Sequence, residues 1–139
     1  LADVNAVILG IAEDTAYTGM ADTLLLPFAK LNTLATTRLG DTRSTILQFL
    51  RQNNTYTAMT GQELTIRGVR GLETAGSGST NRMVAYRRAP DVLKLHIPMA
   101  HRFLPAFQKS PTYVEVAGMF RLGGLDIRRP KEVRYSDGI

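Results

Sequence analysis

The sequence predicts an α+β fold in which helices come first and a mainly antiparallel sheet follows. Apolar residues recur every three or four positions up to about residue 60, and at every second position after it, which supports this class. The spread of proline is a third observation, because five of the six prolines lie at residue 90 or beyond. A proline usually marks the edge or the end of a strand.

The first helix is expected at the start of the chain. Its apolar residues follow the spacing of one helical face: Leu1, Val4, Val7, Ile8 and Ile11. Gly19 is the expected end of this helix, because glycine accepts the left-handed conformation found at helix ends. Residues 22–26 then form a short apolar run closed by Pro27, which predicts a buried strand.

Two further helices are expected before residue 60. Pro27 suits the first turn of the earlier one. The apolar stripe of that helix consists of Phe28, Leu31, Leu34 and Ala35. Asp41 is the expected N-cap of the later helix, because its carboxylate can accept a hydrogen bond from a free backbone N–H. The pair Asn53–Asn54 is expected to end that helix.

Strands are expected throughout the second half. The predicted ranges are 64–67, 83–86, 92–97, 113–120, 125–128 and 133–135. The alternation slips at Gly68, which indicates a β-bulge. The pair Gly123–Gly124 indicates a hairpin turn between the strands 113–120 and 125–128. Residues 73–81 lack apolar periodicity and are expected to form a flexible loop.

Composition excludes several classes of protein. The 139 residues are 44% hydrophobic and 21% charged, which is ordinary globular material for one compact domain. The absence of cysteine excludes a disulfide scaffold, a thiolate zinc site and a cysteine nucleophile. The longest apolar runs are only a few residues, too short to span a membrane as helices.

The net charge of +5 is unevenly distributed. Residues 1–60 carry a net charge of −1, residues 61–139 carry +6, and arginine outnumbers lysine by thirteen to four. Because arginine makes planar, bidentate contacts with carboxylates and phosphates, the basic half suits either nucleic acid or ion pairs between proteins. The absence of tryptophan and of a run of basic residues weakens the first option without removing it.

The residues offer little for catalysis or for binding a small molecule. His96 and His101 are the only histidines, and Asp91 is the only acidic residue near them in sequence. We expect one strand histidine and one loop histidine with ordinary hydrogen bonds, and no catalytic, cofactor-binding or metal-ligating residue. The glycine-rich run at 76–80 lacks the lysine of a phosphate-binding loop. A surface loop that could touch a neighbouring subunit is the preferred interpretation.

Two arginine pairs are candidates for contacts between subunits. Arg87–Arg88 and Arg128–Arg129 each leave a predicted strand, and alternation places the two members of a pair on opposite faces. One member of each pair can therefore reach a carboxylate or a phosphate across an interface, although solvation at the end of a strand explains the pairs equally well. The candidate contacts are Arg87, Arg88, Arg128, Arg129, Gly76, Ser77, Gly78 and Ser79.

The aromatic residues and the prolines of the second half bear on how the fold is completed. Four aromatic residues are expected mainly in the core, with partner contacts as the alternative: Phe103, Phe107, Tyr113 and Phe120. Prolines at positions 90, 98, 105, 111 and 130 interrupt the predicted sheet and imply long excursions. Such excursions need something to pack against, so the chain is expected to complete its fold in an assembly.

Four stretches resemble one family of proteins. Residues 82–105 and 118–139 look like the C-terminal part of a major capsid protein, and residues 22–27 and 45–54 resemble the preceding segments. The family comprises the shell proteins of tailed bacteriophages and related prophages, which share the Hong Kong-type capsid fold. The order of elements also agrees: helix, apolar strand, two helices, a long loop and then strands.

The resemblance implies a structural protein, not an enzyme, that assembles with copies of itself as pentamers and hexamers of an icosahedral shell around DNA. It implies an axial domain at residues 1 to about 90 and 121–139, and peripheral-domain strands at about 91–120. Capsid proteins of this type are longer than this chain, so Leu1 is expected to be an internal position of a larger subunit. The expected location is the virion, and the bacterial cytoplasm before assembly.

Two other classes of function remain open. A nucleic-acid-binding module would use the arginine-rich second half, and its affinity would fall steeply as salt rises. Packaged DNA can also touch a capsid's inner face without sequence specificity. A small enzyme that uses His96 or His101 with Asp91 is the weaker alternative, because no nucleophile, metal cluster or cofactor loop in the sequence supports it.

Overall fold

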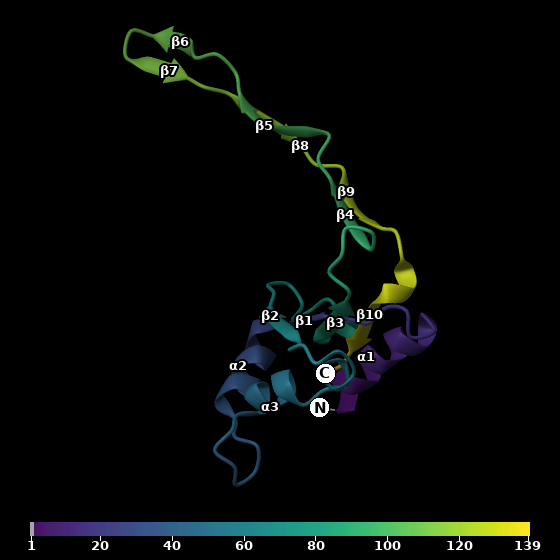
Figure 1. The fold of residues 1–139 in the computed structure, drawn as a ribbon. Helices are drawn as coiled ribbons and strands as arrows, with labels where there is room; N and C mark the ends of the chain where they lie inside the picture. Colours follow the sequence, from purple (N-terminus) through teal and green to yellow (C-terminus); the bar gives the residue numbers. More distant parts are fainter. Residues whose placement is uncertain (1) are drawn as a thin grey trace.

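The structure, a computed structural model, describes residues 2–139. Figure 1 shows two parts: a body of helices and one sheet, and a long two-stranded ribbon that projects from it. The body consists of residues 2–92 and 128–139, and the ribbon of residues 93–127. The predicted α+β class is confirmed. The ribbon supplies no residue to the body's core.

Four helices belong to the body: α1 (Ala2–Asp14), α2 (Phe28–Thr36), α3 (Ile46–Gln52) and α4 (Thr55–Thr60). The N-cap of α3 is Thr45, whose hydroxyl accepts a hydrogen bond from the backbone N–H of Gln48 at 3.3 Å. The prediction that Asp41 caps this helix is wrong. Residues 38–45 instead form a turn that a β-bridge between Arg38 and Thr45 closes.

Two asparagines join the last two helices. Asn53 is the C-cap of α3, so this helix ends where predicted. Asn54 is the N-cap of α4, a helix that was not predicted. The side chain of Asn54 accepts a hydrogen bond from the N–H of Thr57 at 2.9 Å and donates one to the carbonyl of Leu50 at 2.8 Å. Because Asn54 is only 5% exposed, one buried amide holds the end of one helix and the start of the next.

Helix α1 ends earlier than predicted. It stops at Asp14, and Ala16 and Tyr17 adopt positive φ angles in the loop that follows. Gly19 therefore does not end the helix. It packs instead against the last segment of the body, where a Cβ would come within 3.0 Å of the carboxyl carbon of Glu132. Close approach, and not a left-handed conformation, is what requires glycine at this position.

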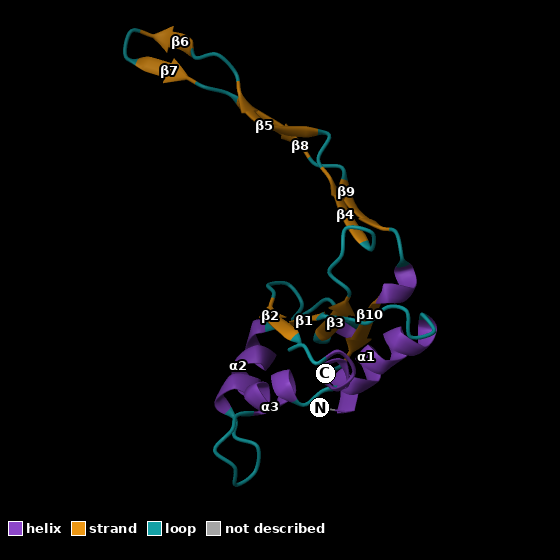
Figure 2. Cartoon of the chain, viewed as in Figure 1, coloured by secondary structure: helices purple, strands orange, loops and turns teal. Residues whose placement is uncertain are grey.

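The sheet of the body has four strands in the order β10-β3-β1-β2. Their bounds are β1 (Thr23–Leu26), β2 (Thr65–Gly68), β3 (Arg82–Tyr86) and β10 (Val133–Asp137). The pair β1–β2 is parallel, and the other two pairs are antiparallel. Gly68 pairs with Leu26 in regular register, so the predicted bulge at Gly68 is wrong. In Figure 2, α2 and α3 lie on the side of the sheet away from the ribbon, and α1 lies beside β10.

The core lies between this sheet and the helices. Leu24, Ile66 and Ala85 occupy paired positions on neighbouring strands, so their side chains point to the same buried face. The facing helix α1 contributes four of the apolar residues predicted for it: Val4, Val7, Ile8 and Ile11. The fifth, Leu1, lies outside the described residues. Each such side chain stabilises the fold by about 1.5–3 kcal/mol when it is fully buried, and this layer therefore holds the body together.

The ribbon consists of three antiparallel segments in succession (Figure 1). The first pairs β4 (Leu93–His96) with β9 (Gly124–Ile127), the second pairs β5 (Met99–Phe103) with β8 (Gly118–Arg121), and the third pairs β6 (Phe107–Ser110) with β7 (Tyr113–Glu115). The chain therefore runs outward through three strands, turns at the tip, and returns through the other three.

Two sequence predictions for the ribbon are wrong. The predicted strand 113–120 is divided into β7 and β8, which pair with different partners. The pair Gly123–Gly124 does not form a hairpin turn, because β8 pairs with β5 and β9 pairs with β4. These glycines instead connect two successive segments of the same ribbon.

Candidate assembly surfaces

The ribbon carries most of the large apolar side chains that are left uncovered. Of the sixteen exposed large hydrophobic residues within 2–139, twelve lie in the ribbon. A two-stranded hairpin is marginally stable by itself in water, and a concentration of exposed apolar residues usually marks an interaction site. The ribbon is therefore the first candidate for an assembly surface.

The first segment of the ribbon has one apolar and one polar face. Residues directly opposite in an antiparallel pair share a face, and the opposed pairs are Leu93 with Ile127 and Leu95 with Leu125. These four aliphatic side chains form one face. The other face holds the opposed pairs Lys94 with Asp126 and His96 with Gly124. The apolar face of this segment is open, since Leu95 and Leu125 are 55% and 60% exposed.

The second segment carries a cluster of rings. The ring of His101 meets that of Phe103 edge-on at 4.8 Å between centroids and lies 6.1 Å from that of Phe120. Gly118 makes room for this cluster, because a Cβ there would lie 2.9 Å from Nε2 of His101. The predicted loop position of His101 is wrong, because this residue belongs to β5.

The aromatic residues of the ribbon are not part of the core. The preferred interpretation of four of them as core residues is wrong, because each is at least 55% exposed: Phe103, Phe107, Tyr113 and Phe120. Their alternative role as contact residues stays a prediction. The sequence alone could not separate the two, because an alternating strand looks the same whether or not another element covers its apolar face.

In the part of the chain that the structure describes, the ion pairs made by charged groups of the ribbon are exposed. His96 Nε2 and Arg128 Nε each lie 3.6 Å from Oδ2 of Asp126, and Lys109 Nζ lies 3.4 Å from Oε2 of Glu115. The strand position predicted for His96 is confirmed. Within residues 2–139, no group of three or more histidine and acidic side chains could hold a metal ion.

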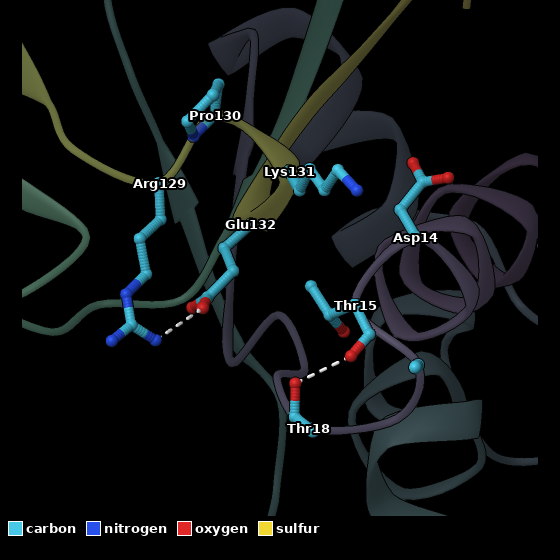
Figure 3. Close-up of a pocket in the computed structure, with 8 residues that line it drawn as sticks. Asp14, Thr15, Thr18, Arg129, Pro130, Lys131 and Glu132 are labelled. Carbon is cyan, nitrogen blue, oxygen red and sulfur yellow. Dashed lines mark hydrogen bonds and ion pairs between the residues drawn. The ribbon is translucent and has the colours of Figure 1, made fainter.

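Four charged side chains meet where the ribbon joins the body, and we call them the junction quartet: Arg87, Asp91, Arg129 and Glu132. Arg87 pairs with Glu132 through Nε, and its Nη2 lies 2.8 Å from Oδ2 of Asp91. Arg129 Nη1 lies 3.2 Å from Oε1 of Glu132, the contact drawn in Figure 3. Its Nη2 lies 3.4 Å from Oδ2 of Asp91. Each arginine therefore contacts both carboxylates.

The junction quartet keeps its carboxylates charged. The hydrogen bond from Arg87, followed by that from Arg129, lowers the pKa of Glu132 against the opposing effect of burial. Burial works in the same opposing direction on Asp91, but the hydrogen bond and charge of Arg87 and the charge of Arg129 outweigh it and lower this pKa as well. The Glu132 side chain is 5% exposed, so its two arginines compensate a largely buried charge.

Within residues 2–139, the other members of the predicted arginine pairs make fewer contacts with carboxylates. The backbone N–H of Arg88 donates to Oδ1 of Asp22 at 2.8 Å, which anchors the end of β3 to the start of β1. Among the described residues, the guanidinium of Arg128 contacts one carboxylate, that of Asp126, at 3.6 Å. Arg87 and Arg129 each contact two carboxylates, and the role of all four arginines between subunits stays a prediction.

The glycine-rich run is an irregular loop except for the short helix η1 (Ser77–Ser79). The N–H of Ser77 donates to Oδ2 of Asp137 at 3.0 Å. Arg82 holds the same carboxylate through two hydrogen bonds of 2.6 and 2.9 Å, and its guanidinium lies 4.2 Å from the centroid of the Tyr135 ring. The hydrogen bond from Arg82 and that from Ser77 lower the pKa of Asp137 to about 2, and this network ties the loop to β10.

Beside the junction quartet lies an open cavity of about 540 Å³ (Figure 3). It lies between the end of α1 and the short helix η2 (Pro130–Glu132). Its lining residues are Asp14, Thr15, Ala16, Thr18, Arg129, Pro130, Lys131 and Glu132. In Figure 3 the side chain of Lys131 extends toward Asp14. The cavity contains no histidine and places no nucleophile beside a base, so its side chains offer no catalytic arrangement.

Comparison with known proteins assigns the fold and the family. The family model described as major capsid protein matches residues 1–139. The chain therefore belongs to the major capsid protein family. A solved structure titled "The capsid of Myoviridae Phage XM1" has a similar fold, with a TM-score of 0.77 and 18% sequence identity.

The match to that structure covers 98% of this chain and 44% of that chain. This chain thus spans less than half the length of the solved capsid protein it matches. The search of curated proteins finds no match. Among residues 2–139, no helix has both the length and the apolar character that crossing a membrane requires.

Proposed function

We propose that this chain is the C-terminal portion of a tailed-phage or prophage major capsid subunit with the Hong Kong-type fold. In this proposal the subunit assembles with copies of itself, as pentamers and hexamers, into an icosahedral shell that encloses DNA. The observation that carries the proposal is the family match over the whole chain. The 44% coverage of the matched capsid chain supports a larger subunit. The subunit would occupy the bacterial cytoplasm before assembly and the virion afterwards.

The proposal divides the chain between two domains of the subunit. The body corresponds to the axial domain, and the ribbon supplies strands of the peripheral domain. The predicted limits of about 91–120 for these strands are close to the ribbon at 93–127, and the return strand extends the region by one segment. The open aliphatic face of the first segment supports the division, because such a face needs a cover that the body does not provide.

Candidate contacts between copies follow from exposure and charge. Rings of five or six copies require heterologous contacts that close by rotation. Arg88 and Arg128 are the members of the two arginine pairs that lie outside the junction quartet, and the loop at residues 76–79 is tied to β10 by Asp137. These groups are the candidates for contacts with a neighbouring copy, together with Arg87 and Arg129 of the junction quartet.

Electron microscopy of the full-length subunit after expression is the decisive test of the proposal. Regular closed shells are the expected result. A full-length protein that stays strictly monomeric under all assembly conditions would contradict it. A charge-reversal variant, Arg88→Glu with Arg128→Glu, should impair assembly while leaving circular dichroism unchanged. Normal shells from that variant would remove these two arginines from the interface.

A second candidate function, binding of nucleic acid, has one observation in its favour. Six arginines of the body make no ion pair in the part of the chain that the structure describes: Arg38, Arg43, Arg51, Arg67, Arg70 and Arg88. Free arginines can contact phosphates, and such binding weakens steeply with salt. A duplex-binding titration at several salt concentrations tests this. Affinity without a salt dependence, or no binding, would exclude both the module and non-specific contact with packaged DNA.

A further inference from the structure

The ribbon is attached to the body through a narrow connection. The ribbon connects to the body through two backbone passages, residues 87–92 on the way out and residues 128–132 on the way back. A thin two-stranded element held only by its backbone would swing about these passages. Figure 1 shows the ribbon projecting away from the body, so contacts at these passages bear on its direction.

We propose that the junction quartet is a positioning device that fixes the direction in which the ribbon leaves the body. Two of its ion pairs cross from one passage to the other: Arg87 with Glu132, and Arg129 with Asp91. The other two lie within a single passage and hold its local conformation: Arg87 with Asp91, and Arg129 with Glu132. The four contacts form a closed ring of alternating charge.

The quartet is also fixed to the body. The N–H of Arg87 donates to the carbonyl of Glu132 at 3.2 Å, so β3 and η2 are joined by backbone as well as by side chains. Gly19 packs directly on the carboxyl group of Glu132, and Asp22 holds the N–H of Arg88. These contacts attach one side of the ring of charges to the body and restrict the orientation of the ring.

The chemistry of these residues suits a directional role. A guanidinium is planar and presents its donors at fixed angles, so an arginine that holds two carboxylates restricts the orientation of both. Glu132 is largely buried, and its charge requires both of its partners. None of the four belongs to the hydrophobic core of the body. The quartet thus acts on the angle of the ribbon more than on the stability of the body.

A distance measurement between the two parts tests this inference. The chain has no cysteine, so spin labels can be placed at Asn32→Cys on α2 and Lys94→Cys on β4, both at exposed positions. Double electron–electron resonance should give a narrow distribution of distances between the two labels. In Glu132→Gln, the distribution should broaden and its maximum should shift. The matched control, Glu115→Gln, removes the ion pair with Lys109 far out on the ribbon and should leave the distribution unchanged.

A second label pair separates loss of direction from loss of folding. Asn32→Cys with Ala58→Cys lies wholly within the body, and its distribution should stay the same in every variant. If Glu132→Gln disturbs this pair, Asp91→Asn becomes the deciding variant, because the Asp91 side chain is 44% exposed and its substitution is expected to leave the body folded. An unchanged distance between positions 32 and 94 in a folded Glu132→Gln or Asp91→Asn protein would overturn the inference.

The consequence for a shell rests on the proposed function. If every copy holds its ribbon at the same angle, full-length subunits with Glu132→Gln should give shells of irregular size, while Glu115→Gln should give normal ones. Absence of shells from the unmodified subunit would contradict the proposed function and leave the distance result standing. Broadened distances with normal shells would confine the role of the quartet to the isolated subunit and overturn its role in assembly.

Discussion

The body and the ribbon place their hydrophobic residues in opposite ways. Thirteen buried residues of the body form one core, to which the ribbon contributes none. In the ribbon, twelve large hydrophobic residues are exposed. Strands of both parts alternate apolar and polar residues, as β2 of the body and β4 of the ribbon do. The comparison teaches that alternation tells which face of a strand is apolar, whereas only the rest of the fold, or a partner, decides whether that face is buried.

The largest expected difference comes from the same substitution made in both parts. Leu24→Ala removes a fully buried side chain at the centre of the sheet and should lower the free energy of unfolding by about 2–5 kcal/mol. Leu125→Ala, at a 60% exposed position of the ribbon, should change it by less than about 0.5 kcal/mol. Urea unfolding followed by circular dichroism measures both. Equal losses would contradict the division into a packed body and an open ribbon.

A smaller effect is expected at the asparagine that joins two helices of the body. Asn54→Ala should lower the free energy of unfolding by about 1–2 kcal/mol, because it removes a cap and leaves buried backbone groups without partners. Thr45→Ala, whose capping bond is longer and more exposed, should cost about 0.5–1 kcal/mol. The same urea experiment ranks the two variants, and the reverse order would show that burial of the amide is unimportant.

A still smaller, pH-dependent effect is expected at Asp137. Its pKa is lowered from 3.8 to about 2 in the folded chain, so its contribution to stability is present above pH 3.8 and is lost as pH falls toward 2. The difference in unfolding free energy between the unmodified chain and Asp137→Asn should therefore shrink over this window. Thermal unfolding at several pH values measures it.

The control for this pH dependence is Asp41→Asn. Asp41 is exposed and makes no ion pair within residues 2–139. If Asp41→Asn reproduces the pH-dependent difference of Asp137→Asn, then the hydrogen bonds from Arg82 and Ser77 are not its source.

The smallest effect on stability is expected from removing the ribbon altogether. The N–H of Arg128 donates to the carbonyl of Val92 at 2.9 Å, so the two ends of the ribbon are adjacent and a short glycine–serine linker can replace residues 93–127. The body should keep its circular dichroism spectrum and its unfolding midpoint. Unfolding of the shortened chain would show that the ribbon stabilises the body and would contradict the comparison.

The elements of the body could largely be predicted from the sequence. Local signals were sufficient where one residue type decides a boundary, as at Pro27 before α2 and Asn53 at the end of α3. Asp41 failed as a cap because Thr45 is placed by the bridge to Arg38, a contact that no local pattern describes. The six-residue helix α4 was missed because it offers too few turns for a periodic signal.

The pairing within the ribbon could not be predicted from alternation, because a period of two does not show which strands pair with each other. One signal was present in the positions of the breaks between strands. The break between β4 and β5 at Pro98 lies opposite the break between β8 and β9, where a Cβ on Gly123 would come within 3.4 Å of the proline ring. Breaks that mirror each other about a central turn indicate one long hairpin. The junction quartet was missed because its members come from distant parts of the sequence. Arg87 and Glu132, for example, are 45 positions apart.

The division of the ribbon into three segments also limits the damage that an insertion can cause. In a continuous hairpin, one extra residue would slip the register of every later pair and turn all the following side chains to the opposite face. Here each segment has its own register, and the second and third already contain an irregularity between paired residues. The joints at Pro98 and Gly123 can absorb a slip before it reaches the next segment. An insertion or deletion in one segment of such a ribbon should therefore leave the register of the other segments unchanged. The ribbon can then change in length over evolutionary time while its other segments keep the same side chains on each face.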